Sequence, residues 1–210
     1  MFIIKKNLAC LLCLTFLGLI FPFTVIADTS EEFYKKGEAA ARNQDWATAE
    51  REYRKAAEQG HLHAQKALAV MYVCYNDRET VKWLRKAAQQ GDSDAQLALA
   101  DSLVDGHCDE TVRNYEEAVH WYRQAAKSEN VRHQAEAHFF LGEMYEYGLG
   151  VSQDLVSAHM WYNLSSMRGD SEAERKKAVS ARDKVAHKLS PEQLARARKM
   201  TEEWKLNRGK

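Results

Sequence analysis

Apolar and small residues recur at the three- and four-residue spacing of amphipathic helices through most of the chain. Residues 28–210 show no sustained alternation of the kind that predicts strands. The predicted helices form four hairpins, at about Glu31–Arg42 with Trp46–Gln59, Leu62–Tyr72 with Arg78–Gln90, Asp94–Val104 with Tyr115–Lys127, and Gln134–Tyr147 with Leu155–Met167. The pattern therefore predicts an all-α fold.

A recurring phrase closes the second helix of each hairpin. It reads Ala-Ala-Glu-Gln-Gly at 56–60 and Ala-Ala-Gln-Gln-Gly at 87–91, with weaker copies at 125–126 and 165–169. A tryptophan precedes three of the copies at an equivalent place, as Trp83, Trp121 and Trp161. Such repetition is typical of stacked arrays. We therefore predict a right-handed α-solenoid of about four repeats over residues 28–170, with these tryptophans in its core.

Local signals predict where the first hairpin begins and ends. Thr29 and Glu32 have the spacing of a capping box for the first helix. Asp45 is a predicted N-cap of the second helix, and Gly60 ends it. Residues 130–133 are predicted to be an insertion between the third and fourth hairpins.

Two further helices are predicted after the repeats. The first covers about Ser171–His187, and the second begins at Ser190, with Pro191 at its first position and Gln193 completing a cap. Because an α-solenoid needs terminal caps with a polar outer side, residues 171–210 are predicted to be capping helices.

Composition narrows the functional classes only a little. The chain has 210 residues, of which 45% are hydrophobic, and only two prolines. It carries 30 basic and 30 acidic residues, a formal net charge of zero. Such a balance gives no overall attraction to nucleic acid or to an anionic membrane.

The N-terminus has the layout of a secretory signal. Lys5 and Lys6 precede an almost wholly apolar stretch from Leu8 to Ile26, and small or branched residues stand before Asp28. We predict a signal peptide over residues 1–27, cleaved after Ala27, and a periplasmic or secreted mature protein. The alternative is an uncleaved anchor, because the apolar stretch is just long enough to span a bilayer. Membrane association is expected only through that anchor.

The fourth hairpin carries a family resemblance. Its matching residues are Ala137, Leu141, Gly142, Tyr145, Gly148, Gly150, Val151, Asp154, Ala158, Trp161 and Tyr162. In this pattern the hairpin resembles the Sel-one-like repeat (SLR), a longer relative of the tetratricopeptide repeat. The first hairpin is closer to a plain tetratricopeptide, and the resemblance covers roughly residues 31–170. It implies an α-solenoid that binds other proteins, often in secretory or envelope settings.

Several candidate sites have structural explanations that fit better. The Gly148–Val151 turn follows a helix rather than a strand, so we expect its glycines to serve the backbone and not a phosphate. His61, His63, His107 and Cys108 are too dispersed to supply the three or four ligands of a zinc site. No serine has a lysine three residues later, and no catalytic triad is recognisable. We therefore predict no catalytic residue, metal or cofactor.

Cys74 and Cys108 are the cysteines that remain after signal removal. Both follow the first helix of neighbouring hairpins, where turns of a solenoid lie side by side. In an oxidising compartment we expect a Cys74–Cys108 disulfide, worth on the order of 4 kcal/mol in the chain-entropy model. The alternative is two free thiols.

A concave surface remains as the candidate functional site. In tetratricopeptide-like arrays the first helix of each hairpin lines the inner groove, and four apolar residues there are predicted to have no core role. The predicted groove residues are Tyr34, Glu38, His63, Lys66, Val70, Leu97, Asp101, Val104, Phe139, Glu143 and Glu146. An apolar strip with a charged rim is the usual form of a peptide-binding groove.

The sequence therefore predicts an exported scaffold or adaptor that binds a protein or peptide in the cell envelope, without enzymatic activity and without nucleic acid. Two other classes stay open. One is an envelope hydrolase acting on cell-wall or β-lactam substrates, which would need convergent catalytic groups. The other is a structural subunit of an envelope complex, which would copurify at fixed stoichiometry.

Overall fold

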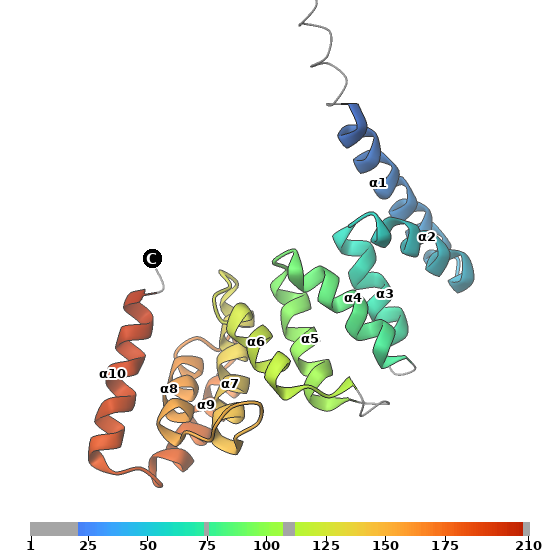
Figure 1. Ribbon diagram of the computed structural model, residues 1–210. Coiled ribbons are helices and arrows are strands. Elements are labelled where there is room, and N and C mark those ends of the chain that lie inside the picture. Colours follow the sequence, from blue (N-terminus) through green and yellow to red (C-terminus); the bar gives the residue numbers. More distant parts are fainter. Residues whose placement is uncertain (1–20, 74–75, 107–111, 208–210) are drawn as a thin grey trace, which may run out of the picture. The chain divides into compact units, whose positions relative to one another are not determined.

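The computed structural model describes residues 21–73, 76–106 and 112–207, with backbone alone for 21–28. Within these ranges the chain forms ten α-helices and no strand, which confirms the all-α prediction (Figure 1). The helices are α1 (Phe21–Arg42), α2 (Trp46–Glu58), α3 (Leu62–Tyr72), α4 (Asp77–Gln89), α5 (Ser93–Asp105), α6 (Tyr115–Ala125), α7 (Val131–Tyr147), α8 (Leu155–Ser166), α9 (Glu172–Ala186) and α10 (Pro191–Asn207).

The chain divides into two compact units, Met1–Ala64 and Gln65–Lys210. The division falls inside the second predicted hairpin, within α3. Each unit is described by itself.

The first unit is built on the α1–α2 hairpin. Gly37 of α1 lies against the ring of Tyr53 of α2, so closely that a Cβ atom on the glycine would be 2.5 Å from the Tyr53 Cδ1 atom. The Asp45 side chain accepts a hydrogen bond from the Thr48 amide, which confirms the predicted cap of α2. A small residue facing an aromatic ring thus allows close approach of the two helices.

The start of α1 differs from the prediction. The helix already includes Phe21, the first described residue, rather than starting near Glu31, so Thr29 lies inside it and does not cap its start. The Thr29 hydroxyl instead donates a hydrogen bond to Gln59 Oε1 at 3.0 Å. No proline or glycine lies between Pro22 and Thr29, so nothing in this stretch stops the helix from extending upstream of the predicted cap.

The second unit is an α-solenoid of stacked hairpins, in which α4 packs on α5, α6 on α7 and α8 on α9. The tryptophans predicted to lie in the core are buried, with exposed fractions of 1% for Trp83, 9% for Trp121 and 5% for Trp161. Two buried glutamines link successive hairpins through their Nε2 atoms. Gln96 donates to the Ala88 carbonyl at 3.3 Å, and Gln134 donates to the Ala126 carbonyl at 2.9 Å.

The predicted insertion at 130–133 is part of a helix. Asn130 is the N-cap of α7, and its side chain accepts from the amides of Arg132 and His133. The helix therefore begins at Val131, three residues before the predicted start, and is 17 residues long where α5 has 13. The inserted residues add nearly one turn to α7.

The turn between α7 and α8 confirms the structural interpretation of its glycines. Gly148 and Gly150 have φ angles of 71° and 67°, in the left-handed region that favours glycine. A Cβ atom on Gly150 would be 2.3 Å from the carbonyl atoms of Tyr115, at the start of α6. The turn thus holds neighbouring hairpins in close backbone contact.

The last two helices both pack on α8. Ser171 and Glu174 form a capping box at the start of α9, and Ser190 and Gln193 exchange hydrogen bonds at the start of α10, as predicted. Trp204 of α10 meets Trp161 edge to face, with 4.7 Å between ring centroids. The C-terminal helices therefore cover an aromatic core position of the last repeat. Among the described residues, no helix combines the length and apolarity that a membrane span requires.

Candidate partner-binding surface

In the first unit, the predicted groove residues form an aromatic cluster. Tyr34 stacks on His61 with ring centroids 4.5 Å apart, and its hydroxyl donates to Glu38 at 3.1 Å. Burial, together with that hydrogen bond, raises the pKa of Tyr34 to about 12. His63 is exposed at the edge of the cluster. His61 Nδ1 accepts from the Ala64 amide, so this ring serves the start of α3.

In the second unit, the predicted apolar groove residues differ widely in exposure. Val70 is 72% exposed and Val104 is half-buried. Leu97 and Phe139 are only 6% and 8% exposed, so the prediction that they have no core role is wrong. Phe139 packs against Tyr162, with 5.4 Å between centroids, in the core of the last hairpin.

The predicted polar groove residues of the second unit are mostly engaged inside the fold. Asp101 accepts from the Tyr122 hydroxyl at 2.6 Å, and Glu146 accepts from the Tyr162 hydroxyl at 2.9 Å. Lys66 pairs with acidic side chains at the start of α5. Glu143 is half-buried, and this burial raises the pKa of its carboxyl group.

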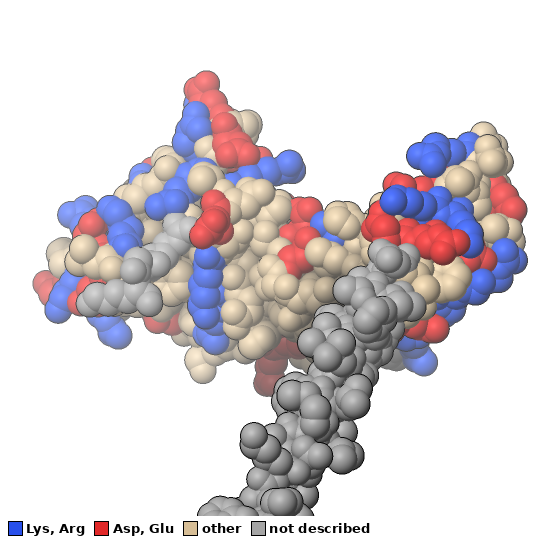
Figure 2. All heavy atoms as spheres, turned by 90° about the horizontal axis from the view of Figure 1, so that it is seen from above, with Lys and Arg blue, Asp and Glu red and all other residues tan. Residues whose placement is uncertain are grey.

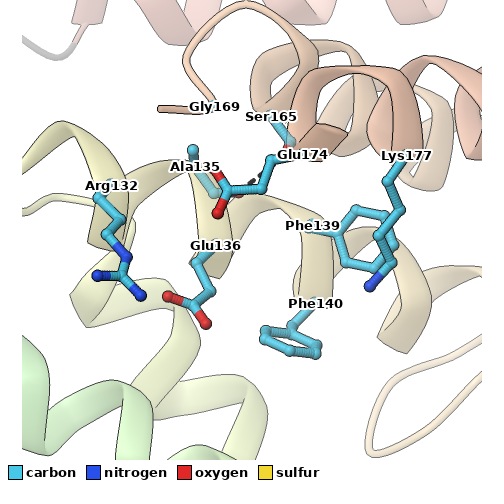
Figure 3. Close-up of a pocket in the computed structure, with 9 residues that line it drawn as sticks. All are labelled: Arg132, Ala135, Glu136, Phe139, Phe140, Ser165, Gly169, Glu174 and Lys177. Carbon is cyan, nitrogen blue, oxygen red and sulfur yellow. Dashed lines mark hydrogen bonds between the residues drawn. The ribbon is translucent and has the colours of Figure 1, made fainter. Parts of the chain in front are cut away.

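A cleft of about 200 Å³ lies between α7 and α9 (Figure 3). Ala135, Phe139 and Phe140 supply its apolar lining, and four charged side chains surround it. These charged residues are Arg132, Glu136, Glu174 and Lys177. Lys177 Nζ stands 4.0 Å from the centroid of the Phe139 ring, at the side of the cleft. A second cleft of about 290 Å³ continues past Phe139 toward Glu143 and Lys184.

Sequence reasoning missed the contribution of α9, because the tail was interpreted only as a cap. A signal was present in the sequence: Gly60 and Gly91 stand two residues before the first helices α3 and α5, and Gly169 stands three residues before α9. The helix therefore stands where the first helix of another hairpin would begin, and its side chains complete the cleft.

Charges on the surface are mixed in sign. On the face shown in Figure 2, Lys and Arg side chains alternate with Asp and Glu, with uncharged residues between them. Among the described residues there is no group of three or more His, Cys, Asp and Glu side chains that could hold a metal ion. Cys74, His107 and Cys108, and with them the predicted disulfide, lie outside the described residues.

The repeat pattern also decides the family. A model described as Sel1 repeat matches residues 53–61, 63–92, 93–130 and 135–170, which together exceed half of the chain. The chain belongs to the Sel1 repeat family. Sel1 repeat proteins generally mediate protein–protein interaction. The matched ranges run from the end of α2 to the end of α8 and leave out α1, α9 and α10.

Two crystal structures are similar to this Sel1 repeat chain. One is c5321, a protective antigen present in uropathogenic Escherichia coli strains that displays an SLR fold, with a TM-score of 0.64 and 27% identity over 86% of this chain and 38% of that chain. The other is a Sel1 repeat protein from Oxalobacter formigenes, with a TM-score of 0.55 and 30% identity over 74% of this chain and 62% of that one. The chain thus spans less than two thirds of either relative. No curated protein matches it.

Proposed function

We propose that this Sel1 repeat protein is an exported adaptor that binds a segment of a protein partner in the cell envelope. The observation that supports this most directly is the cleft between α7 and α9, with its apolar lining and charged rim. Apolar anchors inside a charged rim are the usual composition of a site for a peptide or helix.

Two charged side chains on the rim are engaged in no hydrogen bond or ion pair among the described residues. Arg132 and Glu136 make no side-chain hydrogen bond or ion pair within residues 29–73, 76–106 and 112–207. Both face the cleft from α7 (Figure 3). A partner segment can therefore pair with both charges without breaking an internal contact, while an apolar side chain enters between Ala135 and the phenylalanines.

Export and the disulfide belong to the same proposal. The N-terminal signal layout supports cleavage after Ala27 and a periplasmic or secreted location. Oxidising conditions there would favour a Cys74–Cys108 bond. Such a bond would restrain the second and third hairpins, leaving the cleft at the fourth hairpin unaffected.

A photo-crosslinking experiment in intact cells tests the cleft. A benzophenone amino acid replaces Glu136 in the full chain, and a control variant carries it at Lys199, which is exposed on α10. We expect a discrete crosslinked partner from position 136 and none from position 199. The same partner captured equally from both positions would overturn the assignment of this cleft.

Paired charge swaps give an independent check. Exchanging the two charges as Arg132→Glu with Glu136→Arg keeps the net charge and should weaken partner capture at least tenfold. The matched control is Lys199→Glu with Glu203→Lys, an exposed pair one turn apart on α10. If the control swap weakens capture as much as the cleft swap, the rim charges do not make the contact.

A further inference from the structure

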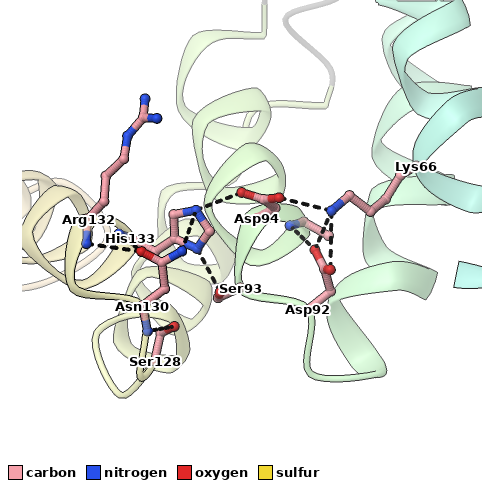
Figure 4. A network of polar contacts seen from close by, with 9 residues as sticks. Lys66, Asp92, Ser93, Asp94, Ser128, Asn130, Arg132 and His133 are labelled. Atoms are coloured by element: carbon pink, nitrogen blue, oxygen red, sulfur yellow. Dashed lines mark hydrogen bonds and ion pairs between the residues drawn. The ribbon is translucent and has the colours of Figure 1, made fainter. Parts of the chain in front are cut away.

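The start of α5 and the start of α7 bring together a serine, a histidine and an aspartate. Ser93 Oγ lies 2.7 Å from His133 Nδ1, and His133 Nε2 lies 2.7 Å from Asp94 Oδ1 (Figure 4). Asn130 Nδ2 approaches the same Nε2 atom at a longer 3.5 Å. The residues are 40 positions apart in sequence, and the extra turn of α7 is what carries His133 to this place.

The protons of this cluster follow from its chemistry. A carboxylate accepts hydrogen bonds and donates none, so His133 Nε2 carries the proton that is shared with Asp94. In a neutral ring the other nitrogen is then an acceptor, and the Ser93 hydroxyl donates to Nδ1. The hydrogen bond with Lys66 lowers the pKa of Asp94, which keeps that carboxyl ionised. A carboxylate, an imidazole and a hydroxyl in series can activate a serine oxygen, as in hydrolase triads. The ring nitrogens are exchanged relative to those triads, because Ser93 meets Nδ1 and Asp94 meets Nε2.

Two backbone amides lie beside the serine. Ser93 and Asp94 are the first two residues of α5, where amides have no partner inside the helix. Asp92 accepts from the amides of Ala95 and Gln96, which are the next two along the chain. The amides of Ser93 and Asp94 have no such partner within the helix, so they are the backbone donors available near Ser93 for an oxyanion. Lys66 Nζ, 3.0 Å from Asp94 and 3.1 Å from Asp92, offsets the nearby negative charge.

We propose that Ser93, with His133 as its base, is an acyl-accepting nucleophile that hydrolyses small carboxylic esters. Ser93 Oγ attacks the ester carbonyl carbon while its proton passes to His133 Nδ1. The tetrahedral intermediate collapses, the carbon–oxygen bond to the alcohol breaks, and the alcohol leaves with that proton. Water then attacks the acyl-serine in the same way, which releases the carboxylic acid and restores Ser93. Asp94 is a positioning residue that holds the imidazole tautomer.

The site is open to solvent, which suits small substrates. The Asp94 side chain is 57% exposed, whereas that of His133 is 15% exposed. The cluster shares no residue with the lining of the cleft between α7 and α9, but Arg132 of the cleft is adjacent to His133 in sequence and contributes to the lowered pKa of Asp94.

Covalent labelling of the full chain tests the proposal. A fluorophosphonate probe is added and the adduct is located by peptide mass spectrometry, in parallel with hydrolysis of p-nitrophenyl acetate. We expect an adduct at Ser93 that is absent in Ser93→Ala and reduced at least about 100-fold in His133→Gln. Asp94→Asn should slow labelling and change its pH profile, a change that a purely structural contact would not produce.

Ser102 supplies the matched control. It also lies on α5, partly buried, with its hydroxyl donating to the Ala98 carbonyl at 2.8 Å. Ser102→Ala should leave both labelling and hydrolysis unchanged. Labelling of Ser93 no greater than that of Ser102, or hydrolysis that persists in Ser93→Ala, would overturn the proposal. Thermal unfolding of each variant shows that a lost adduct is not the result of misfolding.

Discussion

Two equivalent tyrosines, Tyr122 and Tyr162, place their hydroxyls on different acidic residues. Tyr162 lies directly across Gly142 and donates to Glu146, four residues further along α7. The corresponding position in α5 is Ala100, and there Tyr122 donates to Asp101, the next residue. A Cβ atom on Gly142 would be 2.5 Å from the Tyr162 Cδ1 atom, so the ring position in the last hairpin depends on glycine.

A double-mutant cycle checks this dependence. Gly142→Ala should lower the free energy of unfolding by about 1–3 kcal/mol, the usual cost of overpacking. In a Tyr162→Leu background the same change should be neutral or stabilise by up to about 1 kcal/mol, because alanine favours helix over glycine. Urea unfolding of the four proteins measures the coupling. Equal costs of Gly142→Ala in the two backgrounds would show that the ring contact does not set the requirement.

At the scale of whole helices, α8 is the element on which the C-terminal region depends. It packs on α7, α9 and α10, and its His159 is buried beside Arg182 of α9 and Arg198 of α10, with Asp183 also near. His159 Nδ1 is buried without a hydrogen-bond partner in the described part of the chain. Burial has the largest effect on the pKa of this histidine and lowers it, and the positive charges of the two arginines lower it further.

Stability should therefore fall as the solution becomes mildly acidic. The unfolded histidine titrates near pH 6.5 and the folded one at a lower pH. Between these pH values the unfolded chain binds more protons than the folded one. The free energy of unfolding is therefore highest above pH 6.5, where His159 is neutral in both states, and it decreases as the pH falls through the folded pKa. We expect His159→Gln to flatten this slope, measured by urea unfolding with Trp161 and Trp204 fluorescence. His187→Gln, at an exposed position after α9, should leave it unchanged.

At the scale of the molecule, helical periodicity and the repeated phrase were sufficient to predict the fold class and most helix ends. The two wrong ends have local causes: α1 continues upstream of Thr29 because no glycine or proline interrupts residues 23–28, and Asn130 begins a helix where a loop insertion was predicted. The start of α7 is predictable from Asn130, because asparagine is a preferred N-cap.

The candidate site was less predictable, for a physical reason. First helices of a solenoid contact neighbours on two sides, so periodicity cannot separate a groove position from one between helices. Leu97 and Phe139 were assigned to the groove on that basis and are buried. The approach of Ser93 to His133 depends on how two hairpins pack, which no local pattern encodes.

Maturation gives a prediction for the whole chain. Protein recovered from the envelope should begin at Asp28, and its intact mass without reductant should be two protons lower than that of the reduced chain, as a Cys74–Cys108 bond requires. N-terminal sequencing and mass spectrometry measure both. An intact Met1 would indicate an anchor, and a mass that reductant does not change would indicate free thiols.

The glutamines that link successive hairpins have a consequence for work at different ionic strengths. Gln96 and Gln134 are buried and uncharged, and each donates to a backbone carbonyl. Dissolved ions screen exposed charges but have little effect on such neutral, enclosed bonds. These two glutamine bonds should thus hold equally in dilute buffer and in concentrated salt, whereas the partly exposed ion pair of Arg85 with Glu117, which also joins hairpins, should weaken. A salt sensitivity of partner capture would then report on exposed charges, at the rim of the cleft or between hairpins, and not on the glutamine bonds.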